Sequence, residues 1–223
     1  MYVLGLETST DVCAAALCRG GSIVAEIRYK QAQIHAESIA GMVESIMTNS
    51  KVHYADLQGI AVAVGPGSFT GLRVGMALAK GLAWANNLGI IGISTPDAMA
   101  EAVLPNDEEL AIVIPSRKGE IYAAHYQPGN DCHVRQGQVY AVRIDDFKQR
   151  AEGIGRISGP ATEILRDAYP TEFKYLDEPY REVSAAAVAR LGAQKILQDE
   201  ISDPAKIELD YVKPFYSNVR IAG

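Results

Sequence analysis

The sequence has few cysteines and no pair of them placed to form a disulfide. There are three, Cys13, Cys18 and Cys132. Cys13 and Cys18 stand five residues apart in one apparent strand, so their side chains face opposite sides and cannot readily bridge. An odd number of thiols without a pairing scheme is typical of a reduced, cytoplasmic protein.

Long hydrophobic runs are also lacking. The most apolar region, residues 74–93, is interrupted by Lys80, Asn86, Asn87 and several glycines, so no membrane span and no membrane partner are expected. Met1 leads directly into a short apolar run without a basic leader, which predicts no secretory signal peptide. A cytoplasmic location is therefore predicted.

Positive charge is scarce. The chain has 21 Lys and Arg against 27 Asp and Glu, a net charge of −6 and a pI near 5.3. This balance argues against the chain alone gripping a phosphate backbone. Any role with nucleic acid has to come through a more basic partner.

Several catalytic motifs are missing. No Gly-Lys-Ser/Thr follows a glycine-rich loop, as a P-loop requires, and there is no Gly-x-Ser-x-Gly elbow of a serine hydrolase. The four histidines, His35, His53, His125 and His133, include no pair at three- or four-residue spacing, so no helical metal site is predicted. Each is interpreted as a surface histidine or one satisfied by hydrogen bonds. The acidic pairs fall in loops or helix starts, where carboxylates are usually solvated.

The stretch around which the chain is organised is 60–76. An apolar strand ends in a turn, Gly65-Pro66-Gly67-Ser68, and a helix follows over 68–85. Glycine permits backbone angles closed to other residues, and Ser68 is the expected N-cap. Such a turn aims several N–H groups at one point, which suits an anion but equally fits a well-capped strand–helix unit.

This helix contains three internal glycines, Gly71, Gly75 and Gly81, each of which costs about 1 kcal/mol of helix stability relative to alanine. They are expected where another backbone or a neighbouring helix comes close. One stripe mixes apolar and basic side chains (Phe69, Arg73, Met76, Ala77, Lys80 and Trp84). It fits a partner surface and an ordinary amphipathic helix about equally well.

The hydrophobic patterns predict an α/β protein of two lobes, each built as strand-strand-strand-helix-strand-helix. The predicted lobes are 1–105 and 106–223, divided at the acidic, proline-containing stretch 105–109. An alternative for the last helix and the tail is that they pack back on the first lobe. Strands are predicted at 2–7, 12–17, 22–29, 60–64, 89–93, 110–114, 120–126, 133–142, 153–158 and 173–176, and helices at 33–50, 68–85, 95–104, 145–151, 161–168 and 183–198.

Two such lobes resemble the ASKHA architecture of actin, sugar kinases and the Hsp70 ATPase, in which the turn after the first strand of each lobe carries a carboxylate. Here the first such turn, Glu7-Thr8-Ser9, keeps a carboxylate, whereas the second, Pro115-Ser116-Arg117, has none. One ligand or base is then missing from a phosphoryl-transfer site. The interpretation is a lost ATPase centre, with Glu7, Thr8, Ser9, Gly65, Gly67 and Ser68 as a vestigial nucleotide site or simple turn residues.

The chain resembles the TsaB family, also called YeaZ, through five segments spread over nearly its whole length. They are Leu4–Ser9, His35-Ala36-Glu37, the glycine-rich run Gly65–Gly75, Arg117–Tyr122 and Pro214-Phe215-Tyr216. The resemblance implies the two-lobe ASKHA fold and a subunit without catalysis of its own. Its expected partners are the catalytic paralogue TsaD and the ATPase TsaE, in the complex that transfers a threonylcarbamoyl group to adenosine 37 of ANN-decoding tRNAs.

The resemblance further implies a homodimer when TsaD is absent and tRNA contact only through the complex. No cofactor is expected on this chain alone, and ATP or ADP is expected only at the level of the complex.

Two departures from the family motifs fit a subunit without catalysis of its own. The His-x-x-x-His metal motif of the catalytic paralogue is broken here, since Ile39 follows His35, and Ser116 stands where the family more often has Asp.

By the same resemblance, the partner surface lies on the helices 33–50 and 68–85. The residues expected in it are His35, Ile39, Met42, Ile46, Arg73, Met76 and Lys80. Ile39, Met42, Ile46 and Met76 are taken as the apolar anchors, which would leave an exposed apolar patch on the free chain, although Ile39 and Ile46 fit an inward orientation equally well. Arg73 and Lys80 are expected to set partner choice more than affinity.

Two other functions are open to a chain of this fold class. An ATP-dependent small-molecule kinase on the same fold is the main alternative, and the missing carboxylate at Ser116 speaks against it. A peptidase is the other, and the sequence offers neither a nucleophile–base pair nor zinc ligands for it.

Overall fold

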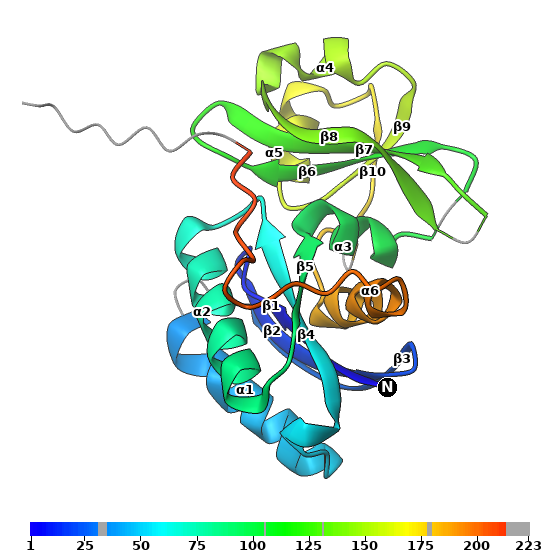
Figure 1. Cartoon of the computed structure of the whole chain (residues 1–223). Helices are drawn as coiled ribbons and strands as arrows, with labels where there is room; N and C mark the ends of the chain where they lie inside the picture. The colour runs from blue at the N-terminus through cyan, green and yellow to red at the C-terminus, as the bar shows by residue number, and fades with distance from the viewer. Residues whose placement is uncertain (31–34, 105, 131, 178–179, 213–223) are drawn as a thin grey trace, which may run out of the picture.

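A computed structural model describes residues 1–30, 35–104, 106–130, 132–177 and 180–212 of the chain, with the backbone alone for 35–37. Figure 1 shows two α/β lobes stacked on each other, the N-terminus in the lower one. Among the described residues, no helix is both long and apolar enough to cross a membrane.

The first sheet has the strand order β3-β2-β1-β4-β5. β1 (Tyr2–Glu7), β2 (Val12–Arg19) and β3 (Ser22–Lys30) form an antiparallel meander, and β4 (Leu57–Gly65) and β5 (Ile90–Ser94) continue it in parallel. β1 is paired on both sides and is buried from its second residue onward. Central strands covered on both faces need nearly continuous apolar sequence, as β1 and β4 have.

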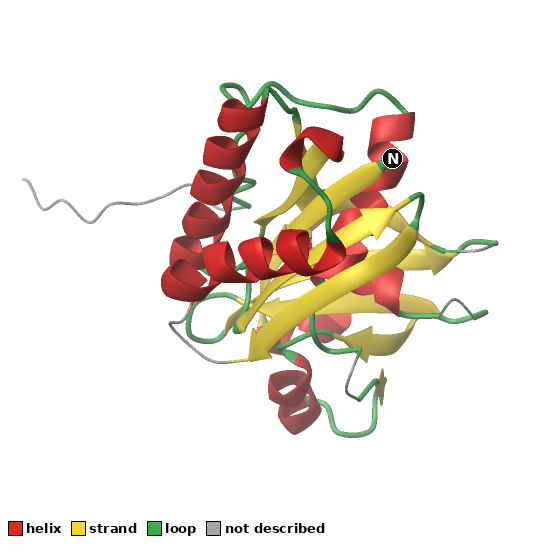
Figure 2. Ribbon diagram, turned by 90° about the horizontal axis from the view of Figure 1, so that it is seen from below, coloured by secondary structure: helices red, strands yellow, loops and turns green. Residues whose placement is uncertain are grey.

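Two long helices, α1 (His35–Ser50) and α2 (Phe69–Asn86), cover one face of the first sheet. Their apolar side chains pack against the apolar side chains on this face of β1, β2 and β4. Figure 2, seen from below, shows one long helix crossing the strands and the other standing beside them. A short 3₁₀ turn (Tyr54–Asp56) leads from α1 into β4.

The second half of the chain repeats the topology. Its sheet has the order β10-β9-β6-β7-β8. β6 (Glu109–Pro115), β7 (Glu120–Pro128) and β8 (His133–Arg143) are antiparallel, and β9 (Ile154–Ser158) and β10 (Lys174–Tyr175) lie parallel to β6. β9 is preceded by a 3₁₀ turn (Ile144–Asp146) and α4 (Phe147–Arg150). It is followed by α5 (Thr162–Ala168). The outer face is closed by a core around Phe147 and Leu165.

Between the two sheets lie α3 (Thr95–Ala102) and α6 (Ala185–Leu197). One continuous apolar core joins them to β1, β2 and β4 below and to β6 and β7 above. α6 follows the second lobe in sequence but packs along the first sheet, as its place in Figure 1 shows. Glu26 on β3 caps its start by accepting from Ser184 Oγ (2.8 Å) and Ala186 N (3.1 Å).

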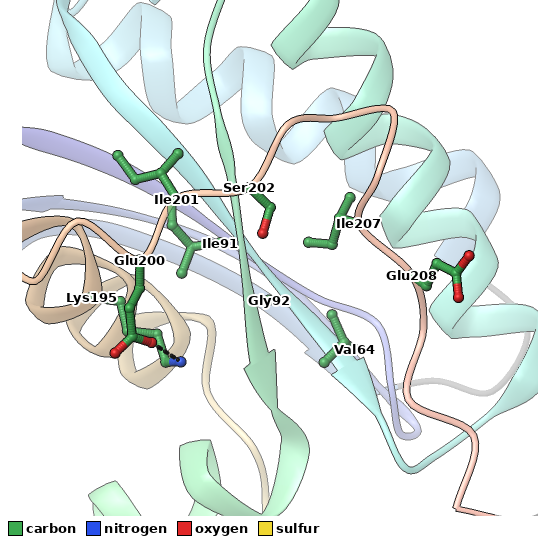
Figure 3. A pocket seen from close by; sticks show the side chains of 9 residues that line it. All are labelled: Val64, Ile91, Gly92, Lys195, Glu200, Ile201, Ser202, Ile207 and Glu208. Carbon is green, nitrogen blue, oxygen red and sulfur yellow. Dashed lines mark hydrogen bonds and ion pairs between the residues drawn. The ribbon is translucent and has the colours of Figure 1, made fainter.

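After α6 the chain turns back over the edge of the first sheet. Ser202 exchanges two backbone hydrogen bonds with Ile90 on the edge strand β5, and Asp210 N donates to Val64 O at 2.9 Å. A hollow of about 280 Å³ lies beneath this segment, next to Gly92 and Ile207. Figure 3 shows its mouth bounded by the Lys195–Glu200 ion pair (2.8 Å).

The predicted two-lobe ASKHA fold and its duplicated topology are confirmed. The main deviations are short elements: residues 145–151 form a 3₁₀ turn and one helical turn instead of a helix, and the strand at 173–176 is two residues long. Ile34 and the segment Pro214-Phe215-Tyr216 lie outside the described residues.

Candidate functional site

The glycines at the start of α2 bring this helix against the turn after β1. A Cβ at Gly67 would lie 2.1 Å from Ser9 O, one at Gly71 2.0 Å from Thr8 O, and one at Gly75 2.3 Å from Thr8 Oγ1. Thr8 Oγ1 donates to Gly71 O at 2.7 Å. The expectation that another backbone or a neighbouring helix comes close to the internal glycines is therefore correct for Gly71, whereas Gly75 meets the side chain of Thr8. Gly81 has nothing within 4 Å of its Cβ position.

Two N–H groups at the junction of the Gly65–Ser68 turn and α2 are used within the chain. Ser68 N donates to Ser9 O at 2.7 Å, and Ser68 Oγ accepts from Gly71 N at 3.2 Å, which confirms Ser68 as the N-cap. Gly65 has a φ of +119°, which suits glycine. These two bonds are those of a capped strand–helix unit, and they take the N–H groups of Ser68 and Gly71 away from any anion.

Glu7 ends β1 with its carboxyl sealed from solvent. Its Oε1 accepts from Ser9 N and Ser9 Oγ, each at 2.6 Å, while Oε2 has no partner in the described structure. Burial raises the pKa of Glu7 to about 7, and the bonds from Ser9 oppose that rise. A buried carboxyl with one unsatisfied oxygen is therefore harder to ionise than a solvated one, and it keeps its proton to higher pH.

The turn after β6 is the equivalent position in the second lobe. It has no acidic residue between Pro115 and Glu120, and Ser116 N donates to Glu120 O at 3.2 Å. Ser116 lines a cleft of about 250 Å³ between the lobes, together with Ser9, Asp11 and Ser68. The two turns thus face one cleft, and Glu7 lies buried beneath it instead of among its lining residues.

Four of the predicted partner-surface residues are buried inside the first lobe. Exposure is 2% for Ile39, 3% for Met42, 1% for Ile46 and 7% for Met76. The expectation that they form an exposed apolar patch is wrong. Helical spacing identifies an apolar stripe but does not give its direction, and in α1 this stripe closes the core over the first sheet.

The outward faces of the two helices carry small and polar residues instead. On α1 these are Ala40, Gly41, Glu44, Ser45, Thr48 and Asn49, and on α2 they are Thr70, Arg73, Ala77, Gly81, Trp84 and Ala85. Trp84 is 68% exposed. Lys80 is half-buried, and the side chain of His35 lies outside the described residues.

Trp84 belongs to the mixed apolar and basic stripe of α2 but is not among the residues expected in the partner surface. The signal was available, since Trp84 is eleven residues after Arg73 and therefore on the same face of a helix. Arg73 itself is exposed, and its guanidinium lies 3.7 Å from the centre of the Phe69 ring. Tyr211 also contacts the Phe69 ring, with ring centres 5.8 Å apart and the two rings tilted by 39°. No sequence pattern points to this last contact.

All four histidines are predicted to lie at the surface or to be satisfied by hydrogen bonds. This is correct for the three whose side chains the structure describes. His53 is exposed, and His125 Nε2 lies 2.7 Å from Tyr140 Oη. His133 Nε2 lies 3.1 Å from an Arg156 Nη. Among the residues that the structure describes, no group of His, Cys, Asp or Glu side chains could hold a metal ion. Cys13 and Cys18 are both buried and belong to cores on opposite faces of the sheet.

Acid should weaken the protein through His133. Arginine only donates, so Nε2 of His133 must accept. Burial, with a smaller contribution from the Arg156 charge, lowers the pKa of His133 below its ordinary value of 6.5. The folded chain therefore resists protonation, and the stability is intact above pH 6.5 but falls as pH drops below it. His133→Gln, which keeps an acceptor, should flatten this fall in urea titrations between pH 7 and 5; an unchanged pH profile would contradict it.

The family assignment comes from comparison with known proteins. Residues 22–162 match the protein-family model described as TsaD, tRNA N6-adenosine threonylcarbamoyltransferase. The chain belongs to this family. The resemblance to TsaB proteins, also called YeaZ, is confirmed as well.

Two relatives illustrate the match. The tRNA threonylcarbamoyladenosine biosynthesis protein TsaB of Escherichia coli K12 is 36% identical over 129 residues, which cover 57% of this chain and 55% of that protein. The tRNA N6-adenosine threonylcarbamoyltransferase of Erythrobacter litoralis is 33% identical over 195 residues, covering 73% of this chain and 54% of that protein. The chain spans about half the length of the curated relatives it matches.

The solved structure of YeaZ from Pseudomonas aeruginosa matches over 94% of this chain and 99% of that one, with a TM-score of 0.83 and 21% identity. At this identity the likeness speaks for the fold, which is shared over the whole described length.

Proposed function

We propose that this chain is a subunit without catalysis of its own in the complex that transfers a threonylcarbamoyl group to adenosine 37 of ANN-decoding tRNAs. In this proposal it acts in the cytoplasm, binds TsaD and is required for TsaD activity, with TsaE as a further member of the complex. The names of its relatives support the pathway. Nucleotide, if it binds, does so at the level of the complex, and tRNA is reached only through the complex.

The observation that carries the non-catalytic role is the state of the two strand-end turns. A two-lobe phosphoryl-transfer site needs carboxylates at both turns to hold Mg²⁺ and orient the attacking group. Here the carboxyl that ends β1, that of Glu7, is fully buried, the turn after β6 has none, and Asp11 is the one acidic side chain that lines the cleft between the two turns. The same observation speaks against the alternative of an ATP-dependent kinase.

The partner surface in this proposal is the outward face of α1 and α2. The two helices pack side by side, and at 16 and 18 residues they are about 24 and 27 Å long. Their small exposed residues let a partner helix approach closely, while Trp84 offers one large anchor. A surface of this length can supply the roughly 800 Å² per partner of a standard interface.

The charges of the two helices also support self-association when TsaD is absent. α2 carries Arg73 and Lys80 and no acidic residue, whereas α1 carries Glu37 and Glu44 and no Lys or Arg. In a two-fold dimer the same patch meets its own copy. Each acidic α1 can then face the basic α2 of the other copy.

Trp84→Ala should weaken both the homodimer and the TsaD complex by about 2 kcal/mol, because an exposed tryptophan at the centre of an interface is a typical hot spot. Binding is measured by analytical ultracentrifugation and by biolayer interferometry. Leu197→Ala is the matched control, since Leu197 is 76% exposed at the end of α6, away from this surface. Equal affinity of the Trp84 variant and wild type would remove α2 from the interface.

The function itself is tested by omission. The chain, TsaD, TsaE, tRNA and a threonylcarbamoyl donor are mixed, each is left out in turn, and the modified nucleoside is quantified by mass spectrometry. Modification should require both TsaD and this chain, and the chain alone should neither modify tRNA nor turn over ATP. Modification by the lone chain would overturn the non-catalytic role, and steady ATP turnover with a small-molecule acceptor would favour the kinase.

A further inference from the structure

Arg73 is an exposed cation held in a fixed position by an aromatic ring instead of by a carboxylate. Its guanidinium lies 3.7 Å from the centre of Phe69, one helical turn earlier on α2. Most described arginines form ion pairs, such as Arg190 with Glu101 and Arg135 with Asp97. Arg73 has no ion pair in the part of the chain that the structure describes, so its hydrogen-bond donors remain available.

Phe69 is itself in ring contact with the C-terminal segment, residues 199–212. The ring of Tyr211 lies 5.8 Å from that of Phe69 at an interplanar angle of 39°. This segment is anchored just before Tyr211, because Ile207 is buried at 8% exposure in the first-lobe core and Asp210 N donates to Val64 O. In Figure 1 the red segment runs from the end of α6 across β5 to the N-terminal half of α2.

We infer that Tyr211 is a positioning residue for partner recognition: through Phe69 it holds Arg73 ready to bind a carboxylate of the partner subunit. This inference rests on the proposed function, because it requires a partner on the face of α2. It makes the C-terminal segment part of the partner site, although Tyr211 follows the end of α2 by more than 120 residues in sequence.

The chemistry favours a carboxylate. One face of the guanidinium lies on Phe69, which leaves its edge of N–H donors free for the two parallel hydrogen bonds that a carboxylate accepts. α2 has no acidic residue to neutralise Arg73 and Lys80, so an acidic patch on the partner is the complementary surface. Ring stacking reduces the side-chain entropy that Arg73 loses on binding, and this pre-organisation is what Tyr211 contributes.

The test measures the affinity of TsaD for this chain and for single and double variants of it. TsaD itself is kept unchanged. Arg73→Gln should weaken TsaD binding about 10-fold and reduce its salt dependence, as loss of a charge-assisted contact predicts. Tyr211→Leu should weaken binding about 3-fold, a fraction of that effect, because it loosens Arg73 without removing it. Tyr211→Phe keeps the ring and should bind like wild type.

The decisive measurement is the double variant. Tyr211→Leu should have no further effect in the Arg73→Gln background, since its action passes through Arg73. An equal loss in both backgrounds would mean a merely structural role and would overturn the inference. Arg19→Gln is the matched control, because Arg19 also lies over an aromatic ring, 5.4 Å from the centre of Tyr2, and it should leave binding unchanged.

Other results separate this inference from the proposed function. If wild type and Arg73→Gln bind TsaD equally, the inference fails while the partner role stands. If Arg73→Gln lowers affinity for tRNA and leaves that for TsaD intact, Arg73 serves a phosphate and the inference is overturned. If wild type does not bind TsaD at all, the proposed function fails first and the inference falls with it.

Discussion

Gly71→Ala should destabilise the protein by about 3 kcal/mol or more, although alanine is the better helix former. The new Cβ would lie 2.0 Å from the backbone oxygen of Thr8, so either α2 or the turn after β1 has to move. Movement would also strain the bond from Thr8 Oγ1 to Gly71 O. The gain of about 1 kcal/mol in helix propensity cannot offset this.

Gly81→Ala is the matched control on the same helix. Nothing lies within 4 Å of its Cβ position, so only the helix propensity changes and the variant should be more stable by about 1 kcal/mol. Urea denaturation followed by circular dichroism measures both variants. Opposite signs for the two glycines are expected, and a stabilising effect at Gly71 would show that the turn after β1 is not packed against α2.

Glu7→Gln should make the protein more stable than wild type by about 3 kcal/mol above pH 7, and equal to it below pH 4.5. Burial raises the pKa of Glu7 from 4.5 to about 7, so the folded chain holds a proton that the unfolded chain releases between these values. The stability that this group contributes is fully present below pH 4.5 and is lost as pH rises through 7. Glutamine keeps the oxygen that accepts from Ser9 and carries no charge.

The measurement is the difference in unfolding free energy between wild type and Glu7→Gln across pH 4 to 8. The contributions of other groups such as His133 to the pH dependence are the same in both proteins and cancel in this difference. Glu44→Gln is the matched control for the substitution itself, since it removes a carboxyl that is exposed on α1. A flat difference for Glu7→Gln would mean that the Glu7 carboxyl is solvated.

Strand and helix positions followed from the sequence because their patterns are local. β1 begins and ends where predicted, and α2 is shifted by one residue, since Ser68 is the cap and not part of the helix. The weakest predictions were the short elements around 145–151 and 173–176, in which three or four residues give too little periodicity.

The partner surface was harder to predict because direction is a tertiary property. Ile39, Met42, Ile46 and Met76 do form apolar stripes on their helices, but these stripes face the first sheet. The residues on the outward faces of α1 and α2 are small or polar, except for the large ring of Trp84. Phe69 and Arg73 are four residues apart and could be paired from sequence, whereas Tyr211 reaches them only through the fold.

The position of α6 has a consequence for how the protein is made. This helix, from the last quarter of the chain, lies against β1, from its first seven residues, and fills the space between the sheets. A nascent chain that has emerged only through β5 would have one face of its sheet uncovered, since the residues that cover it are still to be translated. Contacts of such long sequence separation slow folding, so the first lobe is completed only after synthesis of the second, and residues 1–104 alone should need a chaperone to avoid aggregation.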